Sequence, residues 1–156
     1  MQHASKKQPV QVRLELQADK VREAVLPWLH LLPPCLQSSF MEKPEFHVTL
    51  YYSRNPELPL IFDTFVGNRQ NSAVEVLLKA IVFDEFCVCL AACLPRNIPC
   101  SVEKPHVTLG TGFCDGKRVP PAYSNALLEK VDKSPVPTLI ALPAMPSLTG
   151  TVVCLR

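Results

Sequence analysis

Two copies of one tetrapeptide, His-Val-Thr-Leu, occur in the chain, at residues 47–50 and 106–109. On a β-strand, a histidine and a threonine two positions apart point to the same face, about 6.5–7 Å from each other, while the valine and leucine point to the opposite face. Two such strands side by side would present two imidazoles and two hydroxyls to one cleft. Imidazoles act as acid and base near neutral pH, and hydroxyls donate to anionic oxygens. The motifs therefore predict a site for an anionic substrate that acid–base chemistry can cleave, such as a phosphodiester.

Each of these residues also has an ordinary structural explanation. A lone histidine on a strand is usually a hydrogen-bonded structural residue, and β-propensity alone accounts for threonine in a strand. Because the same pair occurs twice, we interpret His47 and His106 as catalytic residues, and Thr49 and Thr108 as residues that bind the substrate phosphate.

The length and composition indicate a single folded domain. A chain of 156 residues is long enough to bury a core, and 47% hydrophobic with 19% charged residues favours a globule over a disordered chain. The net charge of +2, from 16 basic and 14 acidic residues, is too balanced to predict nucleic-acid binding from the overall field. We expect a flexible tail over residues 1–9, one domain over residues 10–156, and only local contacts to RNA.

The sequence also argues against several classes of protein. No apolar run is long enough to cross a membrane, and the polar N-terminus carries no secretory signal. The seven cysteines form no Cys-x-x-Cys pair and no Cys/His knuckle, and the carboxylates lack the spacing of metal ligands. We therefore expect no metal and no cofactor, and an intracellular protein of the nucleus or cytoplasm whose free thiols lie in the core.

Hydrophobic periodicity predicts the elements that must position the motifs. A helix is expected to begin at Asp19 as N-cap, to be interrupted at Pro27 and to end at Pro33-Pro34, and a second helix is expected over residues 123–131. Prolines predict loops, the first of them over residues 55–70 and the second over residues 112–121. Strands are predicted at residues 10–16, 46–52, 74–83, 86–94, 104–110, 138–142 and 149–155, the third and fourth forming a hairpin around Asp84-Glu85.

This order of elements predicts the fold class. Each half of the chain contributes one His-Val-Thr strand and one helix, which indicates an α+β protein with largely antiparallel sheets and helices on the outer faces. A two-lobed architecture with a central cleft would let the two motifs face each other.

Four further residues are candidates for contact with a nucleotide. Packing in the core or at the rim is the more ordinary role of aromatic residues in a strand. Tyr51 shares the strand parity of His47 and Thr49, so it faces the cleft in this prediction and is the better candidate to stack on a base, while Tyr52 would face the other way. Gly110 and Thr111 follow the second motif, where a glycine would let the backbone approach a phosphate or would simply end the strand. Arg54, shortly after the first motif, is the fourth candidate, as a basic contact.

The paired motifs resemble those of the two-histidine (2H) phosphoesterases, whose mark is two His-x-Thr/Ser motifs, and the spacing of fifty-nine residues between the histidines fits that family. The chain is most similar to one branch of it, the 2′,3′-cyclic phosphodiesterase domain of plant- and fungal-type tRNA ligases. This resemblance extends from about residue 10 onward, and residues 113–123 form a Gly- and Pro-rich insert that departs from it. The similar segments are residues 46–50, 105–112, 124–128 and 148–152.

The resemblance implies hydrolysis of an RNA 2′,3′-cyclic phosphate end to a 2′-phosphate and a 3′-hydroxyl, without a metal ion. It also implies that His106 is the base toward water, that His47 is the acid toward the leaving ribose oxygen, and that kinase and ligase modules belong to the same polypeptide. We expect a monomer. Alternatives that stay open are a 2H enzyme acting on 2′,5′-oligoadenylate or on RNA 3′ ends, and a non-catalytic module that binds RNA ends or nucleotides.

Overall fold

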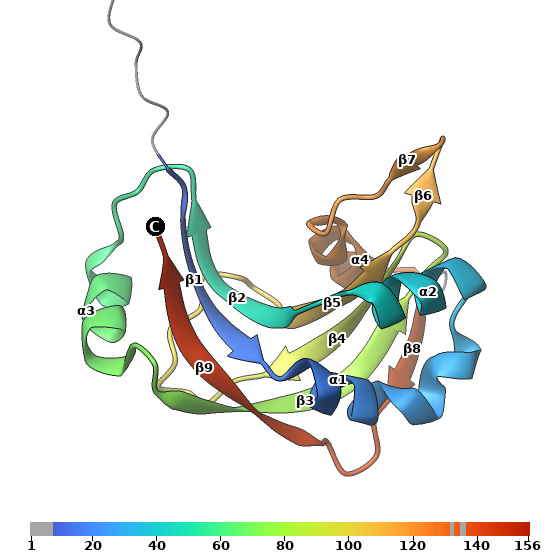
Figure 1. The fold of residues 1–156 in the computed structure, drawn as a ribbon, viewed down its shortest axis with the longest axis horizontal. Helices are drawn as coiled ribbons and strands as arrows, with labels where there is room; N and C mark the ends of the chain where they lie inside the picture. Colours follow the sequence, from blue (N-terminus) through green and yellow to red (C-terminus); the bar gives the residue numbers. More distant parts are fainter. Residues whose placement is uncertain (1–7, 132, 135–136) are drawn as a thin grey trace, which may run out of the picture.

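The computed structural model describes residues 8–131, 133–134 and 137–156, and an antiparallel sheet that closes on itself dominates it (Figure 1). Six strands form the closed ring in the order β4-β5-β2-β1-β9-β3, because β3 also pairs with β4, and β8 extends the sheet on β3. The strands are β1 (Val10–Leu16), β2 (Phe46–Ser53), β3 (Ala73–Phe83), β4 (Cys87–Cys93), β5 (His106–Thr111), β8 (Thr138–Ala141) and β9 (Ser147–Leu155). A separate hairpin consists of β6 (Phe113–Cys114) and β7 (Lys117–Arg118).

Alternating side chains place the main core on one side of this sheet. In β1, Val12 and Leu14 are fully buried, while Arg13 between them is only half-buried. Val48 of β2 and Val107 of β5 join them in the same cluster of buried apolar side chains. Burying these branched side chains supplies the main stabilisation of the fold, at about 1.5–3 kcal/mol for each one.

Helices cover parts of the sheet (Figure 1). Among them, α2 packs on β5, α3 lies against β9, and α4 covers β4 and β3. Within the described residues, no helix is both long and apolar enough to cross a membrane. The helices are α1 (Ala18–Val25), the 3₁₀ helix η1 (Leu26–Leu31), α2 (Pro34–Glu42), α3 (Leu60–Arg69) and α4 (Tyr123–Val131).

Most predicted elements are confirmed, with bounds within two residues. The predicted loop over residues 55–70 is wrong, because α3 lies there and buries Phe62, Phe65 and Val66 at helical spacing. Asp19 lies inside the first turn of α1 rather than at its N-cap, which is Gln17.

Two more predictions need correction. Pro33-Pro34 ends one helix but also starts another, α2, in which Pro34 is the first residue and its missing N–H costs no hydrogen bond. The thiols do not all lie in the core: Cys87 and Cys89 are buried against α4, whereas Cys93 is exposed, as are Cys35 and Cys114. The strand β4 is buried on both faces only along its first part, which explains the difference within that strand.

The α+β class and the antiparallel pairing are confirmed, whereas the division into two lobes is not shown. The six-stranded ring is continuous, so no break separates one half of the sheet from the other. Its narrowest connection is between β2 and β5, which are joined by one residue pair, Val48 with Val107. That pair is the centre of both tetrapeptide motifs.

Candidate functional site

The pairing of Val48 with Val107 brings the two motifs together. In an antiparallel pair, the neighbours of two opposed residues face each other in reverse order. His47 therefore lies across from Thr108, and Thr49 lies across from His106, on the face opposite the two buried valines. The structure thus places the two imidazoles and the two hydroxyls around one point, in a nearly symmetric arrangement.

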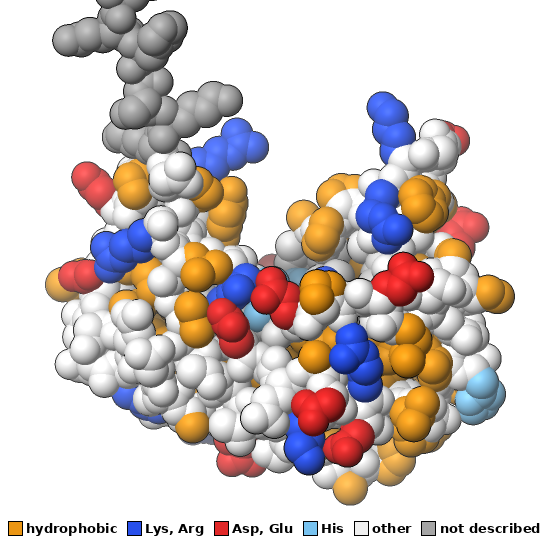
Figure 2. Space-filling view, in the orientation of Figure 1, with side chains coloured by type: hydrophobic (Ala, Val, Ile, Leu, Met, Phe, Trp, Pro, Cys, Tyr) orange, Lys and Arg blue, Asp and Glu red, His pale blue; other side chains and the backbone are white. Residues whose placement is uncertain are grey.

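These four side chains line one pocket of about 460 Å³. A volume of this size suits a nucleotide-sized ligand. Figure 2 shows the molecule hollowed between the side that carries α3 and the side that carries the β6–β7 hairpin. The other polar side chains of the lining are Gln11, Lys43, Tyr52, Ser101 and Asn125.

Burial lowers the pKa of both histidines in the free protein, which favours their neutral forms. Burial lowers the pKa of His47 to about 4, and the positive charges of Arg13 and Lys43 act in the same direction. Burial also lowers the pKa of His106 below its ordinary value, although the carbonyl of Lys104 opposes this effect. The charge of each imidazole therefore depends on what binds beside it, and an anionic ligand would raise both pKa values.

One nitrogen of each ring is left for the pocket. His106 Nδ1 lies 2.8 Å from the carbonyl oxygen of Lys104, which can only accept, so Nδ1 carries a proton and donates it. His47 Nδ1 is buried and has no hydrogen-bond partner within the described part of the chain. In both residues Nε2 is the nitrogen available for proton transfer.

A polar side chain next to each threonine can donate a hydrogen bond to its hydroxyl oxygen. Gln11 Nε2 donates to Thr49 Oγ1 at 3.2 Å, and the amide orientation is fixed because Arg13 Nη1 donates to Gln11 Oε1 at 3.4 Å. Since an amide N–H cannot accept, the hydroxyl proton of Thr49 is free to point into the pocket.

A matching chain of groups lies behind Thr108. Its Oγ1 is 2.9 Å from the hydroxyl of the fully buried Ser124, which is itself 3.3 Å from Cys87 Sγ. Burial raises the pKa of the Cys87 thiol to about 11, so the thiol keeps its proton and can donate to Ser124. Ser124 can then donate to Thr108, whose own hydroxyl donates to the carbonyl of Pro121 at a long 3.5 Å, so a phosphate oxygen would have to take the place of that carbonyl.

The prediction that Tyr51 faces the cleft is wrong, and Tyr52 lines the pocket in its place. The register of β1 and β2 shifts between Val12 and Arg13, so Val12 pairs with Tyr51 and Arg13 pairs with Thr49. This β-bulge leaves Leu50 as an extra residue and reverses the parity of the strand beyond it. The Tyr51 ring consequently packs on Phe62 of α3, with ring centroids 4.8 Å apart.

The two tyrosines give a matched pair of variants. Tyr52→Ala is expected to weaken binding of an RNA end by about 1 kcal/mol or more, because a base loses its stacking surface, while the free energy of unfolding stays nearly unchanged. Tyr51→Ala is expected to lower the free energy of unfolding by about 2 kcal/mol or more, because it opens a gap beside Phe62. Substrate titration and urea denaturation of both variants check this, and the reverse outcome would place the bulge elsewhere.

The other predicted contacts do not line this pocket. Arg54 is exposed beyond the end of β2, and Lys43 is the basic residue beside the first motif instead. Gly110 and Thr111 line a second pocket next to the first. A Cβ at Gly110 would come within 3.1 Å of the backbone nitrogen of Phe40, so this glycine allows α2 to approach β5.

Sequence reasoning missed several residues of the site. Gln11 and Arg13 were interpreted only as the polar positions of a half-buried strand, although alternation did place them on one face. Lys43 precedes the first motif, in the turn after a helix that was not predicted. Among the described residues, no group of three or more His, Cys, Asp or Glu side chains is placed to hold a metal ion.

Comparison with known proteins identifies the family. Residues 4–153 match the family described as the fungal tRNA ligase phosphodiesterase domain. The chain belongs to this family. It is the phosphodiesterase domain of a tRNA ligase, which cleaves 2′,3′-cyclic phosphate ends during tRNA splicing, so the branch and the enzyme class predicted from the sequence are confirmed. As a tRNA ligase domain it acts on RNA ends.

A solved structure described as the crystal structure of a fungal RNA kinase has a similar fold. The two superimpose with a TM-score of 0.64 at 16% sequence identity, over 97% of this chain and 46% of that chain. At this identity the likeness shows the fold alone, and the chain spans about half the length of that protein. No curated protein sequence matches the chain.

Proposed function

We propose that this phosphodiesterase domain opens the terminal cyclic phosphate to a 2′-phosphate and a 3′-hydroxyl, using His47 and His106 for proton transfer. The observation that carries the proposal is the single pocket in which both imidazoles and both threonine hydroxyls surround the Val48–Val107 pair. The single residue pair between β2 and β5 also supports a two-lobed 2H arrangement, with one motif on each side of the cleft.

The proposed reaction needs two proton transfers. The base removes a proton from water as the water oxygen attacks phosphorus, and the bond between phosphorus and O3′ breaks. The acid gives its proton to O3′, so that the products are a 3′-hydroxyl and a 2′-phosphate. By resemblance to the 2H family, His106 is the base and His47 is the acid. Because the five-membered cyclic phosphate is strained, the protein needs only to carry out these two proton transfers and to stabilise the charge on the phosphate.

Thr49 and Thr108 are proposed to bind the two non-bridging phosphate oxygens. The donors behind them support this role. Gln11 donates to Thr49, which leaves the Thr49 proton free for the phosphate, and Ser124 can donate to Thr108, whose proton would move from the Pro121 carbonyl, 3.5 Å away, to a phosphate oxygen. Fixed donors cost no reorganisation during the reaction. Lys43 adds a positive charge to the same lining, and burial lowers its pKa from the ordinary lysine value.

The proposed product is tested with an oligoribonucleotide that ends in a 2′,3′-cyclic phosphate. We expect a product that a 3′-phosphate-specific enzyme leaves intact, that a general phosphatase converts to a 2′,3′-diol, and that a ligase requiring a 2′-phosphate accepts. A 3′-phosphate product would refute the proposed regiochemistry while leaving the two-histidine chemistry in place. Parallel assays of a 2′,5′-oligoadenylate and of an unmodified RNA 3′ end address the other 2H activities.

The pH dependence should report the lowered pKa values of both histidines. One imidazole must be protonated and the other neutral, and in the free protein both pKa values lie below the usual 6.5. The protonated fraction falls as the pH rises, so kcat/KM is expected to peak below about pH 6.5 and to decline above it.

The kcat profile should peak at a higher pH, because the bound phosphate anion favours the imidazolium. Both profiles come from initial rates between about pH 4 and 9, and each should be bell-shaped. A rate that stays constant from about pH 5 to 9 would contradict paired histidine catalysis.

The whole protein is proposed to contain kinase and ligase modules on the same polypeptide. The extent of the match, 46% of the structure described as a fungal RNA kinase, supports a larger parent protein. We also propose an intracellular location, in the nucleus or cytoplasm, and a monomeric domain. The reading frame that encodes the chain and the mass of the purified domain in solution test these proposals.

A further inference from the structure

A second pocket of about 300 Å³ adjoins the site pocket and has no role in the chemistry described above. The two pockets share Lys43, Thr108 and Pro121, so one wall separates them. The second pocket lies between α2, β5 and the β6–β7 hairpin, and two of its lining residues, Arg118 and Pro121, belong to the insert over residues 113–123 that departs from the family pattern. An anion bound there would be the immediate neighbour of a phosphate in the site pocket.

Ser39 on α2 presents an unused proton to this second pocket. Its Oγ accepts a hydrogen bond from the backbone N–H of Thr111 at 3.0 Å and another from Arg118 Nη1 at 3.4 Å. Both lone pairs of the hydroxyl are therefore occupied, and within the described part of the chain the hydroxyl makes no hydrogen bond as a donor. The group can only donate to an incoming ligand, as expected for a contact to an anion.

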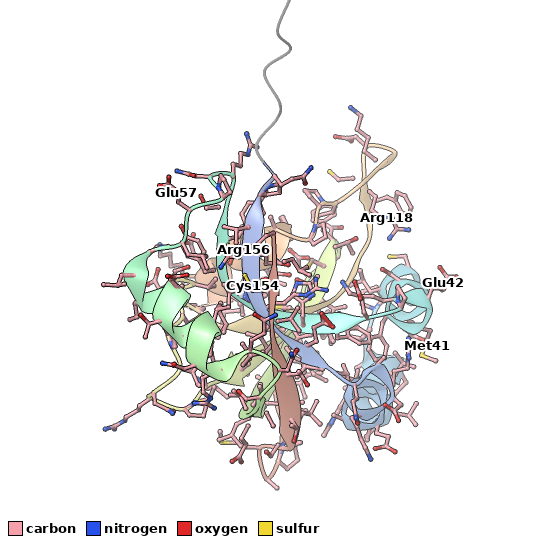
Figure 3. All side chains as sticks on the ribbon, turned by 60° about the vertical axis from the view of Figure 1, so that its left-hand side comes forward. Met41, Glu42, Glu57, Arg118, Cys154 and Arg156 are labelled. Atoms are coloured by element: carbon pink, nitrogen blue, oxygen red, sulfur yellow. The ribbon has the colours of Figure 1, made fainter. Side chains whose placement is uncertain are left out.

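Arg118 on β7 holds a guanidinium at the same place. Its carbon Cζ lies 4.7 Å from the ring centroid of Phe113, and Nη1 also donates to the carbonyl of Thr111 at 3.2 Å. These contacts fix the Nη1 side of the planar guanidinium, while its Nε and Nη2 make no hydrogen bond to any of the described residues. Figure 3 shows Arg118 on the hairpin and Glu42 on α2 on the same side of the molecule. Glu42 supplies one negative charge to the lining, against two positive charges from Arg118 and Lys43.

We propose that this second pocket binds the phosphodiester on the 5′ side of the terminal nucleoside, through Arg118, Ser39 and Lys43. The proposal rests on the function proposed above and names the next subsite along the RNA. An RNA end has one anionic group adjacent to its cyclic phosphate nucleotide, namely this phosphodiester. Its two anionic oxygens match the donors of the pocket. These donors are the free N–H groups of the Arg118 guanidinium, the hydroxyl of Ser39 and the ammonium of Lys43.

Two matched substrates isolate this contact. The first is adenosine 2′,3′-cyclic phosphate, and the second is the same molecule with a methyl phosphodiester on its 5′-oxygen, which adds one negative charge and no second base. The wild-type domain is expected to turn over the second substrate with a kcat/KM about tenfold higher, as for one added charge-assisted hydrogen-bonded contact. Arg118→Gln and Ser39→Ala should each lower this ratio toward one, and the larger fall is expected for Arg118→Gln.

The ratio removes any general effect of a variant on the catalytic pocket, because both substrates share the same cyclic phosphate. Lys117→Gln is the matched control, since Lys117 precedes Arg118 on the same hairpin but does not line the pocket, and it should keep the wild-type ratio. A wild-type ratio near one, or an unchanged ratio in Arg118→Gln with an intact thermal transition, would overturn the subsite. No turnover of either substrate by the wild-type domain would instead refute the proposed function.

Discussion

Alanine in place of His47 or His106 is expected to lower kcat by about 10²–10⁴-fold on a cyclic-phosphate-ended RNA, as for the loss of a positioned acid or base. The reason lies in the pocket, where each imidazole lies opposite the threonine of the other motif, next to the Val48–Val107 pair. Neither His47 nor His106 can replace the other, because each would have to move a proton at a different atom of the substrate. Initial rates at saturating substrate measure the effect.

His30→Ala is the control for this prediction. His30 lies on η1, is exposed and does not line the pocket, so its loss should leave kcat within twofold of the wild type. Circular dichroism and thermal denaturation confirm that the histidine variants fold. If one histidine variant kept more than a tenth of the wild-type rate, that imidazole would have no direct part in the chemistry.

The threonine variants should lose less activity than the histidine variants. Thr49→Val and Thr108→Val each remove one hydrogen bond from a neutral hydroxyl to the phosphate, worth about 1–3 kcal/mol. Gln11→Ala should resemble a weakened Thr49 variant, because the hydroxyl of Thr49 loses the donor that directs its proton into the pocket.

The sequence predicted the strands of the site because their signal is local. In β1, β2 and β5 the apolar and polar residues alternate, and the buried side is the same one that the pattern indicates. The grouping of His47, Thr49, His106 and Thr108 in one pocket followed from the repeated motif alone. What these side chains do in the reaction remains a prediction.

The side-chain parity beyond Leu50 could not be predicted from β2 itself. The bulge depends on pairing with β1, and the carbonyl of Leu50 accepts hydrogen bonds from both the backbone N–H and the hydroxyl of Ser101, some fifty residues away. No glycine or proline in residues 46–53 marks it. Tyr51 was therefore assigned to the wrong face by a rule that holds only while the register is unbroken.

The missed helices have different causes. In α3, the prolines before residue 60 outweighed a real helical signal from Phe62, Phe65 and Val66. In α2, Pro34 was interpreted as the end of a helix, although proline is also favoured at the first position of a helix. The position of α2 in turn determines where Lys43 lies, so a basic residue of the site was missed together with the helix.

The division of labour between the histidines can be tested with a substrate whose leaving group needs no acid. Replacing the bridging O3′ of the cyclic phosphate by sulfur gives a thiolate leaving group, which departs without protonation near neutral pH because a thiol is far more acidic than an alcohol. If His47 is the acid, this substrate should restore most of the rate lost in His47→Ala, about 10²-fold or more. The same substrate should leave His106→Ala slow, because water still has to be deprotonated.

The charges around the free site make this experiment decisive. Burial, Arg13 and Lys43 lower the pKa of His47 to about 4, whereas the Lys104 carbonyl partly offsets the effect of burial on His106. His47 can act as the acid only if the negative charge of the bound phosphate raises its pKa and Lys43 is neutralised by the same anion. Rescue of His106→Ala instead would mean that His106 is the acid in the complex and that His47 stays neutral there. If neither variant is rescued, the two imidazoles do not share the proton transfers in this way, and their role is to bind the phosphate.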